Sequence, residues 1–183
     1  MDANTNITLD LLNQAIVADI QAQFPQLKTV EFYRDDRKTL PKPACLLSMN
    51  EFEGSPEDDP GTEQLAVLMK FEAELLISFS TPLAKQEIRK LAASVAAWLN
   101  NRRWNNPTGA TLKLPTGPCM VTGAYPDDFQ PDLDQFEIWR IDWMQIVHLG
   151  DTVWTGGGVV PTDVFSREGV NGVPDSEYDQ VAP

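Results

Sequence analysis

The chain contains few side chains that could act as a nucleophile, a base or a metal ligand. Its one histidine is His148, and its two cysteines are Cys45 and Cys119. A catalytic Ser or Cys needs an adjacent base, and a structural zinc ion needs about four ligands, so these three residues are too few for a Cys/His zinc site. His148 lies in an alternating stretch typical of a strand. That setting favours a surface or interface histidine over a member of a catalytic triad.

Both cysteines lie in apolar, strand-like runs, ACLL and PCMV. We interpret them as buried free thiols of a protein made in a reducing cytoplasm. Because the sequence does not give the distance between Cys45 and Cys119, a disulfide between them stays open at this point.

Acidic residues are the other candidates for chemistry. The stretch 50–61, NEFEGSPEDDPG, carries five acids, and carboxylates can bind calcium or, as a pair, cleave a glycosidic bond. The calcium-loop spacing does not occur, and paired acids are found on any acidic surface. Gly156–Gly158 lack the following Lys-Ser/Thr of a phosphate-binding loop, which favours a hinge. We therefore predict a non-enzyme without cofactor or metal; the alternative is a small hydrolase or sugar-binding domain that uses acids of 50–61 or 126–137.

The net charge of the chain argues against some classes of binding partner. The 183 residues include 27 acids and 14 bases, a formal net charge of −13, which repels phosphate backbones and anionic lipid. We expect no specific nucleic-acid binding and no membrane partner. The first ten residues, MDANTNITLD, do not resemble a signal peptide, and no apolar run is long enough to span a bilayer, so we expect synthesis in the cytoplasm.

Hydrophobic periodicity predicts two helices and five strands that would position these residues. Leu9, Leu12, Ile16, Ile20 and Phe24 form one apolar stripe of the first helix. Hydrophobic residues make up 42% of the chain, enough for a packed core. The predicted order is a helix over 8–24, strands over 27–33 and 44–49, a solvated loop over 50–61, a strand over 65–79, a helix over 82–104, and strands over 119–125 and 136–149.

The strand over 65–79 and the helix that follows it have one polar side each. Odd-numbered positions of the strand are apolar, whereas Lys70, Glu72, Glu74 and Ser78 share the other face, which we expect to meet water or another subunit. Ser80 or Thr81 is predicted to cap the helix, with Pro82 at its first position. The outer side of the helix is basic and is a candidate interface, with the residues Lys85, Arg89, Lys90, Arg102 and Arg103.

The last 34 residues differ in composition from the rest of the chain. Residues 150–183 hold six of the eleven glycines, six acids and one base, and they show no helix or strand period. They also carry Trp154, Val164 and Phe165, large apolar residues that are candidate anchors for an interface. The arm either binds a partner or folds back over its own domain. We therefore predict a core domain over 1–149 and an extended arm over 150–183.

The element order is typical of an α+β fold, with a single mixed or antiparallel sheet covered by two helices and an extended C-terminal arm. The segments that carry a wider resemblance are PACLLSMNEFE, LAVLMKFEAELLISFS, PLAKQEIRKLAASVAAWLNNRRW and WRIDWMQIVHLG, followed by VWTGGGVVPTDVFSREGVNGVPDSEYDQV. In the order of the predicted elements and in the pattern of residue types, they resemble the tail terminator, or tail-completion, proteins of long-tailed bacteriophages, especially those with contractile tails.

The resemblance implies a structural protein of the virion, assembled in the host cytoplasm. It implies a homo-oligomeric ring, usually a hexamer, that caps the head-proximal end of the tail tube and joins it to the neck. The implied partners are other copies of the chain, the tail tube or sheath protein and a neck or collar protein, and DNA would pass through the ring. Two other functions stay open besides the hydrolase: another head–tail connector or neck protein, and an acidic inhibitor that mimics nucleic acid.

Overall fold

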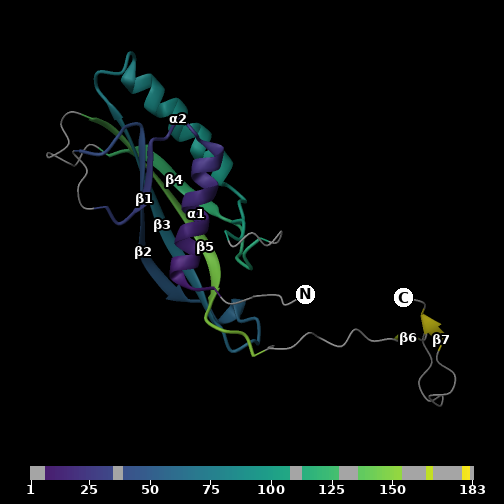
Figure 1. Cartoon of the computed structure of the whole chain (residues 1–183). Helices are drawn as coiled ribbons and strands as arrows, with labels where there is room; N and C mark the ends of the chain where they lie inside the picture. Colours follow the sequence, from purple (N-terminus) through teal and green to yellow (C-terminus); the bar gives the residue numbers. More distant parts are fainter. Residues whose placement is uncertain are drawn as a thin grey trace. The chain divides into compact units, whose positions relative to one another are not determined.

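A five-stranded sheet with two helices on one face makes up the larger part of the structure, a computed structural model (Figure 1). It describes residues 7–34, 39–107, 113–127, 136–153, 164–166 and 179–181. The elements follow the order α1 (Leu9–Gln23), β1 (Thr29–Phe32), β2 (Ala44–Gly54), the 3-10 helix η1 (Pro56–Asp58), β3 (Leu65–Ser78), α2 (Ala84–Leu99), β4 (Met120–Pro126), β5 (Phe136–Leu149), β6 (Val164–Ser166) and β7 (Asp179–Val181).

The sheet is mixed, as predicted. Its strand order is β1-β2-β3-β5-β4, with β1 parallel to β2 and every other pair antiparallel. The predicted α+β class and the predicted order of helices and strands over the first 149 residues are therefore confirmed. β3 and β5 pair along their whole length, from Leu65 opposite Leu149 to Ser78 opposite Phe136, and form the long centre of the sheet.

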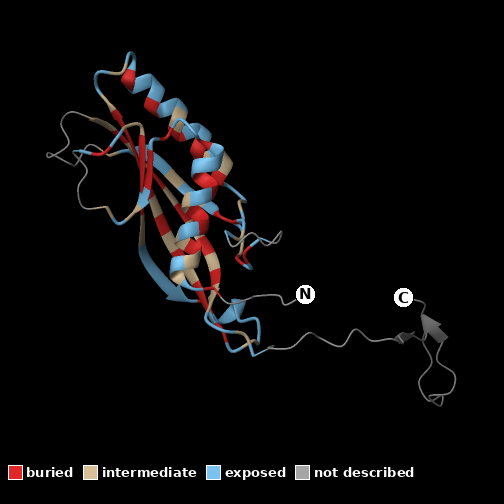
Figure 2. Cartoon of the chain, viewed as in Figure 1, coloured by how far each residue is buried: buried red, intermediate tan, exposed pale blue. Residues whose placement is uncertain are grey.

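Both helices pack on the face of the sheet formed by the odd-numbered residues of β3 (Figure 1). Thr8 caps α1 by accepting a hydrogen bond from the Leu11 amide at 3.2 Å. Trp143 of β5 is fully buried and stacks on Phe71 of β3, with ring centroids 5.1 Å apart. Figure 2 shows buried positions along both helices and the central strands, and the core includes Leu12, Ile16, Ile20, Met69, Leu75, Ile88, Val95 and Leu99. Burial of each such side chain contributes roughly 1.5–3 kcal/mol to the free energy of folding.

The predicted solvated loop over 50–61 is wrong for its first half. β2 continues to Gly54 and pairs with β3, after a register shift between Met49 and Glu51. Strand pairing is possible there because Glu51 and Glu53 project onto the solvated face of the sheet and pair with Lys70. A strand with one face exposed to water tolerates a polar residue at every second position.

The predicted start and end of the second helix are also wrong. α2 begins at Ala84 rather than at Pro82, because the chain makes two turns after β3, in which the Thr81 amide bonds Ser78 and the Ala84 amide bonds Thr81. Neither Ser80 nor Thr81 caps it. It ends at Leu99 rather than at residue 104, and the Asn101 amide then bonds the carbonyl of Cys119 at 2.8 Å.

The chain divides into two units, residues 4–153 and residues 154–183 with 1–3. Gly150–Val153 are tied to the first unit, since the Gly150 amide bonds Ile7 and the Val153 amide bonds Thr62. In the second unit β6 pairs antiparallel with β7, two short strands within the segment that the sequence predicts as an extended arm. Three-residue strands are too short to show a period in the sequence.

Candidate interaction surfaces

Among the described residues, those that cover the face of the sheet opposite the helices lie at its two ends. At one end Leu40, Leu46, Leu76 and Ile138 form a small buried cluster under the 39–43 loop. At the other end His148 bonds the carbonyl oxygen of Asp58 through Nε2, at 3.0 Å. The middle of the face, between these two loops, is open to solvent.

A hollow of about 350 Å³ lies in this open middle, lined by residues of β2, β3, β4 and β5. On its β2 side the Lys70 ammonium lies between two carboxylates, 2.6 Å from Glu53 and 3.3 Å from Glu51. Hydrogen bonds from Lys70 hold the pKa of Glu53 below its ordinary value, and hydrogen bonds to Glu53 and Glu51 raise the pKa of Lys70. Lys70 and Glu53 therefore stay charged at neutral pH.

The other side of the hollow is organised around Arg140 of β5. Its guanidinium lies 3.5 Å from Glu72 and 3.2 Å from Asp142, and it also bonds the hydroxyl of Tyr125. Burial and a hydrogen bond donated to Asp142 raise the pKa of Tyr125, so the phenol remains protonated. Asn50 donates to Glu72 at 2.9 Å and links the two sides.

We call this hollow and the carboxylates around it the acidic basin. It comprises the carboxylates Glu51, Glu53, Glu72, Glu74 and Asp142 and the two cations Lys70 and Arg140. Five negative and two positive groups leave a formal excess of three negative charges. The side chains of Glu51 and Glu53 are 53% and 55% exposed and are the carboxylates that a partner reaches most easily, whereas Glu74 is buried.

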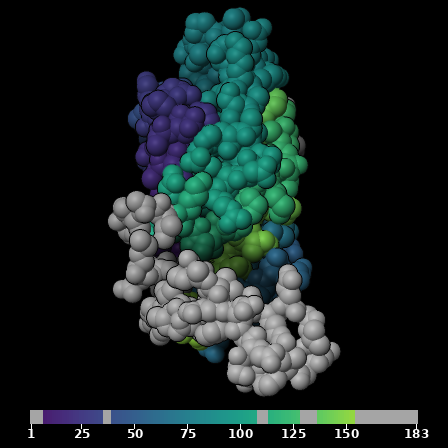
Figure 3. All heavy atoms as spheres, turned by 90° about the vertical axis from the view of Figure 1, so that its right-hand side faces the viewer, coloured from purple at the N-terminus to yellow at the C-terminus, as the bar shows by residue number. Residues whose placement is uncertain are grey.

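Three of the five predicted basic interface residues share the outer side of α2, which Figure 3 shows in teal. Lys85, Arg89 and Lys90 are exposed. The Arg89 guanidinium packs over the ring of Trp139, 5.1 Å from its centroid, and Lys90 pairs with Glu87 at 2.8 Å. Glu87 is the one acid of the helix, so this side carries an excess of positive charge.

Arg102 and Arg103 lie beyond the end of α2, and the structure separates them from that surface. Arg103 is exposed, whereas Arg102 is half-buried, 3.4 Å from Asp19 and stacked 4.4 Å from the centroid of Trp98. Asp19 also accepts two bonds from Asn105, at 2.9 and 2.6 Å. Arg102 therefore links the chain after α2 to α1, and its role as an interface residue stays a prediction.

Two exposed apolar residues at the start of α2 were not predicted as interface residues. Leu83 is 67% exposed and Phe79 is 50% exposed. Leu83 also has a left-handed backbone, φ 55° and ψ 36°, a conformation that costs a non-glycine residue roughly 1–2 kcal/mol. The available sequence signal was the pair of large apolar residues on either side of the turn residues Ser80–Pro82.

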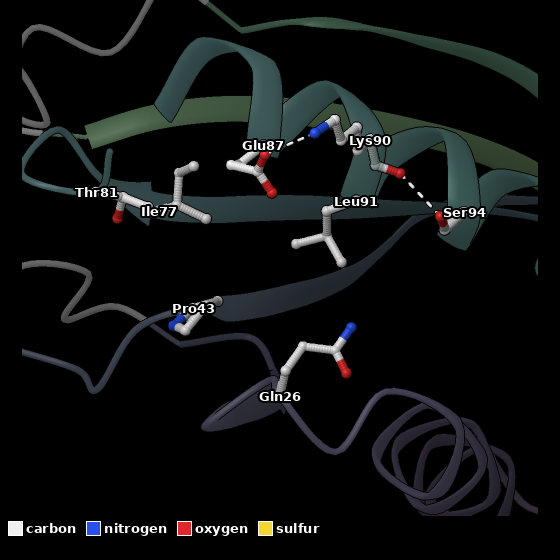
Figure 4. Close-up of a pocket in the computed structure, with 8 residues that line it drawn as sticks. All are labelled: Gln26, Pro43, Ile77, Thr81, Glu87, Lys90, Leu91 and Ser94. Atoms are coloured by element: carbon white, nitrogen blue, oxygen red, sulfur yellow. Dashed lines mark hydrogen bonds and ion pairs between the residues drawn. The ribbon is translucent and has the colours of Figure 1, made fainter. Parts of the chain in front are cut away.

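A second hollow, of about 340 Å³, opens between α2, the end of β3 and the loops that carry Gln26 and Pro43 (Figure 4). Ile77 and Leu91 point into it, and Lys90 and Glu87 lie on its rim. Its mixed lining offers apolar contact but no convergent set of charged or nucleophilic groups. It contains no arrangement that would favour one ligand over another.

Two of the three predicted anchors of the arm lie in β6. Trp154 lies outside the described residues. Val164 and Phe165 belong to β6, where their backbones are paired with Val181 and Gln180 of β7.

The two cysteines are free and buried, which resolves the question of a disulfide. Burial raises the pKa of both thiols to about 12, so neither forms a thiolate at neutral pH. Within the described ranges, no three acidic, cysteine or histidine side chains gather closely enough to hold a metal ion. In the same ranges, no helix combines the length and apolar character needed to cross a lipid bilayer.

Replacing His148 with alanine should change little. The substitution removes one partly exposed hydrogen bond to Asp58, and such a bond contributes about 1 kcal/mol. We expect the free energy of unfolding, measured by urea titration, to fall by about that amount or less, with assembly unchanged. Any hydrolysis of a phosphoester, peptide or glycoside that disappears in the His148→Ala chain would instead identify His148 as catalytic.

Comparison with known proteins places the chain in no family. No protein-family model matches it, and no curated protein matches its sequence. Several solved structures align with the chain; one of them aligns with 80% of this chain and 99% of its own length, with 13% sequence identity and a TM-score of 0.47. A likeness at this level carries no argument about function.

Proposed function

We propose that this chain is a structural protein that assembles with copies of itself into a closed ring, and that the ring is the tail terminator of a long-tailed bacteriophage. The observation that carries the ring is the charge distribution of the domain over residues 4–153. An acidic basin lies on one face of its sheet, and the basic side of α2 lies over the opposite face. A cyclic ring needs two different, complementary patches on each subunit.

The assignment to a phage tail rests on the resemblance of the sequence. A terminator ring would cap the head-proximal end of the tail tube and contact a neck protein. The net charge of −13 is compatible with DNA passing through such a ring, because like charges repel within a Debye length of about 8 Å at physiological salt. No catalytic step is required of the subunit.

The test is the mass of the full chain in solution, measured by light scattering after size exclusion, together with electron microscopy of the virion that carries it. We expect a particle several-fold heavier than the 20.4 kDa monomer, with a central hole, and labelled chain at the head-proximal end of the tail. Surface ion pairs are screened by salt, so the ring should dissociate progressively as ionic strength rises.

Two outcomes would contradict the proposal at different levels. A chain that stays monomeric at low salt, both free and with tails added, would remove the ring. A ring found in the virion away from the junction of head and tail would keep the assembly and remove the terminator function, leaving another connector or neck component.

A further inference from the structure

The two charged surfaces of this domain point away from each other. The acidic basin is built from the even-numbered residues of β3 and β5, whereas α2 packs on the odd-numbered face. A single rigid domain cannot bring the two surfaces together. Contact between them is possible only between two copies, with the helix side of one copy against the open sheet face of the next.

We name the surface at the start of α2 the α2 ridge; it consists of Phe79, Leu83, Lys85, Arg89 and Lys90. Its apolar part is exposed and its backbone is strained at Leu83, where a left-handed conformation holds the side chain in water. Strain of this kind persists where the surroundings impose it, and it is found more often at binding sites than elsewhere. Lys85 follows Leu83 by two residues and Lys90 lies about two helical turns further along, so positive charge adjoins this apolar part and continues along the helix.

We infer that the α2 ridge of one subunit docks into the acidic basin of the next, an inference that rests on the proposed ring. The basin offers an excess of three negative charges and a concave floor, and the ridge offers three cations against Glu87 on a convex helix. The basin also has apolar residues for Leu83 and Phe79 to contact, since Met120 is 43% exposed and Met144 lines the hollow. A head-to-tail contact of this kind closes into a ring when the rotation between subunits allows it.

The acidic arm over residues 150–183 is the other possible occupant of the ridge, but most of its acids lie outside the described residues. The basin lies in the same unit as the ridge, over residues 4–153, and its charges are fixed by ion pairs to Lys70 and Arg140. A surface whose charged side chains are already held in place loses little conformational freedom on binding.

Complementary charge reversal tests the contact directly in the full chain. One variant carries Lys85→Glu with Lys90→Glu, and the other carries Glu51→Lys with Glu53→Lys; Arg89 is kept because it packs on Trp139. Each variant alone opposes like charges across the interface and should remain monomeric. A mixture of the two restores attraction at both kinds of contact and should assemble at salt concentrations where neither does alone.

The control for the first variant is Lys28→Glu with Lys113→Glu, which changes the net charge equally at two exposed lysines outside both surfaces. It should assemble like the unmodified chain. Thermal melting of every variant verifies that the monomers remain folded.

A third variant, Leu83→Gly, separates the effect on docking from the effect on folding. Glycine adopts the left-handed conformation of residue 83 without strain, so Leu83→Gly should raise the melting temperature of the monomer or leave it unchanged. The same change removes the more exposed of the two apolar side chains of the ridge and should weaken self-association roughly ten- to hundredfold. A residue with a merely structural role would not show this opposite pair of effects.

The outcomes distinguish this inference from the proposed function. An unmodified chain that assembles, with reversal variants that assemble equally well, overturns the ridge–basin contact and leaves the ring. Impaired variants that do not recover on mixing also overturn it, because the charges then do not pair with each other. An unmodified chain that never assembles overturns both.

Discussion

A chain that ends at Val153 should remain folded and form rings, yet lose its binding to the neck or tail. The hydrogen bonds of Gly150 and Val153 to the domain are kept, and both the α2 ridge and the acidic basin lie before this point. The removed arm carries Trp154, Val164 and Phe165. Because each buried large apolar side chain contributes roughly 1.5–3 kcal/mol, loss of two or three anchors should weaken partner binding about a hundredfold or more.

The measurements are the melting temperature, the mass of the ring and the yield of joined heads and tails when the virus depends on the shortened chain. Trp154→Ala should show a milder form of the same joining defect. A shortened chain that aggregates or melts early would make the arm part of the fold of its own domain. A shortened chain that supports normal particle yield would show that the arm is dispensable.

The elements that the sequence predicts well are those whose burial pattern is local. The apolar stripe of residues 9–24 and the alternation of residues 65–78 each record which side faces the core, and the structure has α1 and β3 at these places. The same alternation indicated that Lys70, Glu72 and Glu74 share the open face. The sequence does not show that β2 and β5 lie on either side of β3, and these two neighbours supply the other residues of the candidate site.

The errors arise where distant residues decide the local structure. Residues 50–54 have the composition of a loop, but Lys70 on the neighbouring strand stabilises them as part of β2. Leu83 stands where Pro82 indicates the first turn of a helix, and the left-handed backbone there follows from the two turns that lead out of β3.

Gln145 gives the clearest example of a role that only the three-dimensional structure identifies. It is fully buried in β5 and accepts a hydrogen bond from the indole of Trp104 at 2.7 Å. Its amide donates to the Thr116 hydroxyl at 2.9 Å and to the Gly117 carbonyl at 2.7 Å. These bonds attach the connection between α2 and β4 to the strand that carries Arg140 and thereby fix the helix relative to the basin.

Replacing Gln145 with leucine should therefore cause a large loss of stability. The shape of the side chain is roughly kept, but the Trp104 N–H and the Gly117 carbonyl lose their partner inside the protein. Each buried polar group left unsatisfied costs about 1–3 kcal/mol, so we expect the free energy of unfolding to fall by about 2–6 kcal/mol. Urea unfolding followed by tryptophan fluorescence measures it. The control is Gln14→Leu on the exposed side of α1, which should change stability by about 0.5 kcal/mol or less.

A double-mutant cycle with Trp104→Phe then tests the bond itself. Trp104→Phe alone leaves the Gln145 oxygen without its indole donor, and in the double variant donor and acceptor are both absent. The loss in the double variant should therefore be smaller than the sum of the two single losses by about 1 kcal/mol or more. Strictly additive losses would mean that Gln145 and Trp104 stabilise the fold independently. In that case packing of the indole, rather than this hydrogen bond, would hold the end of α2 against the sheet.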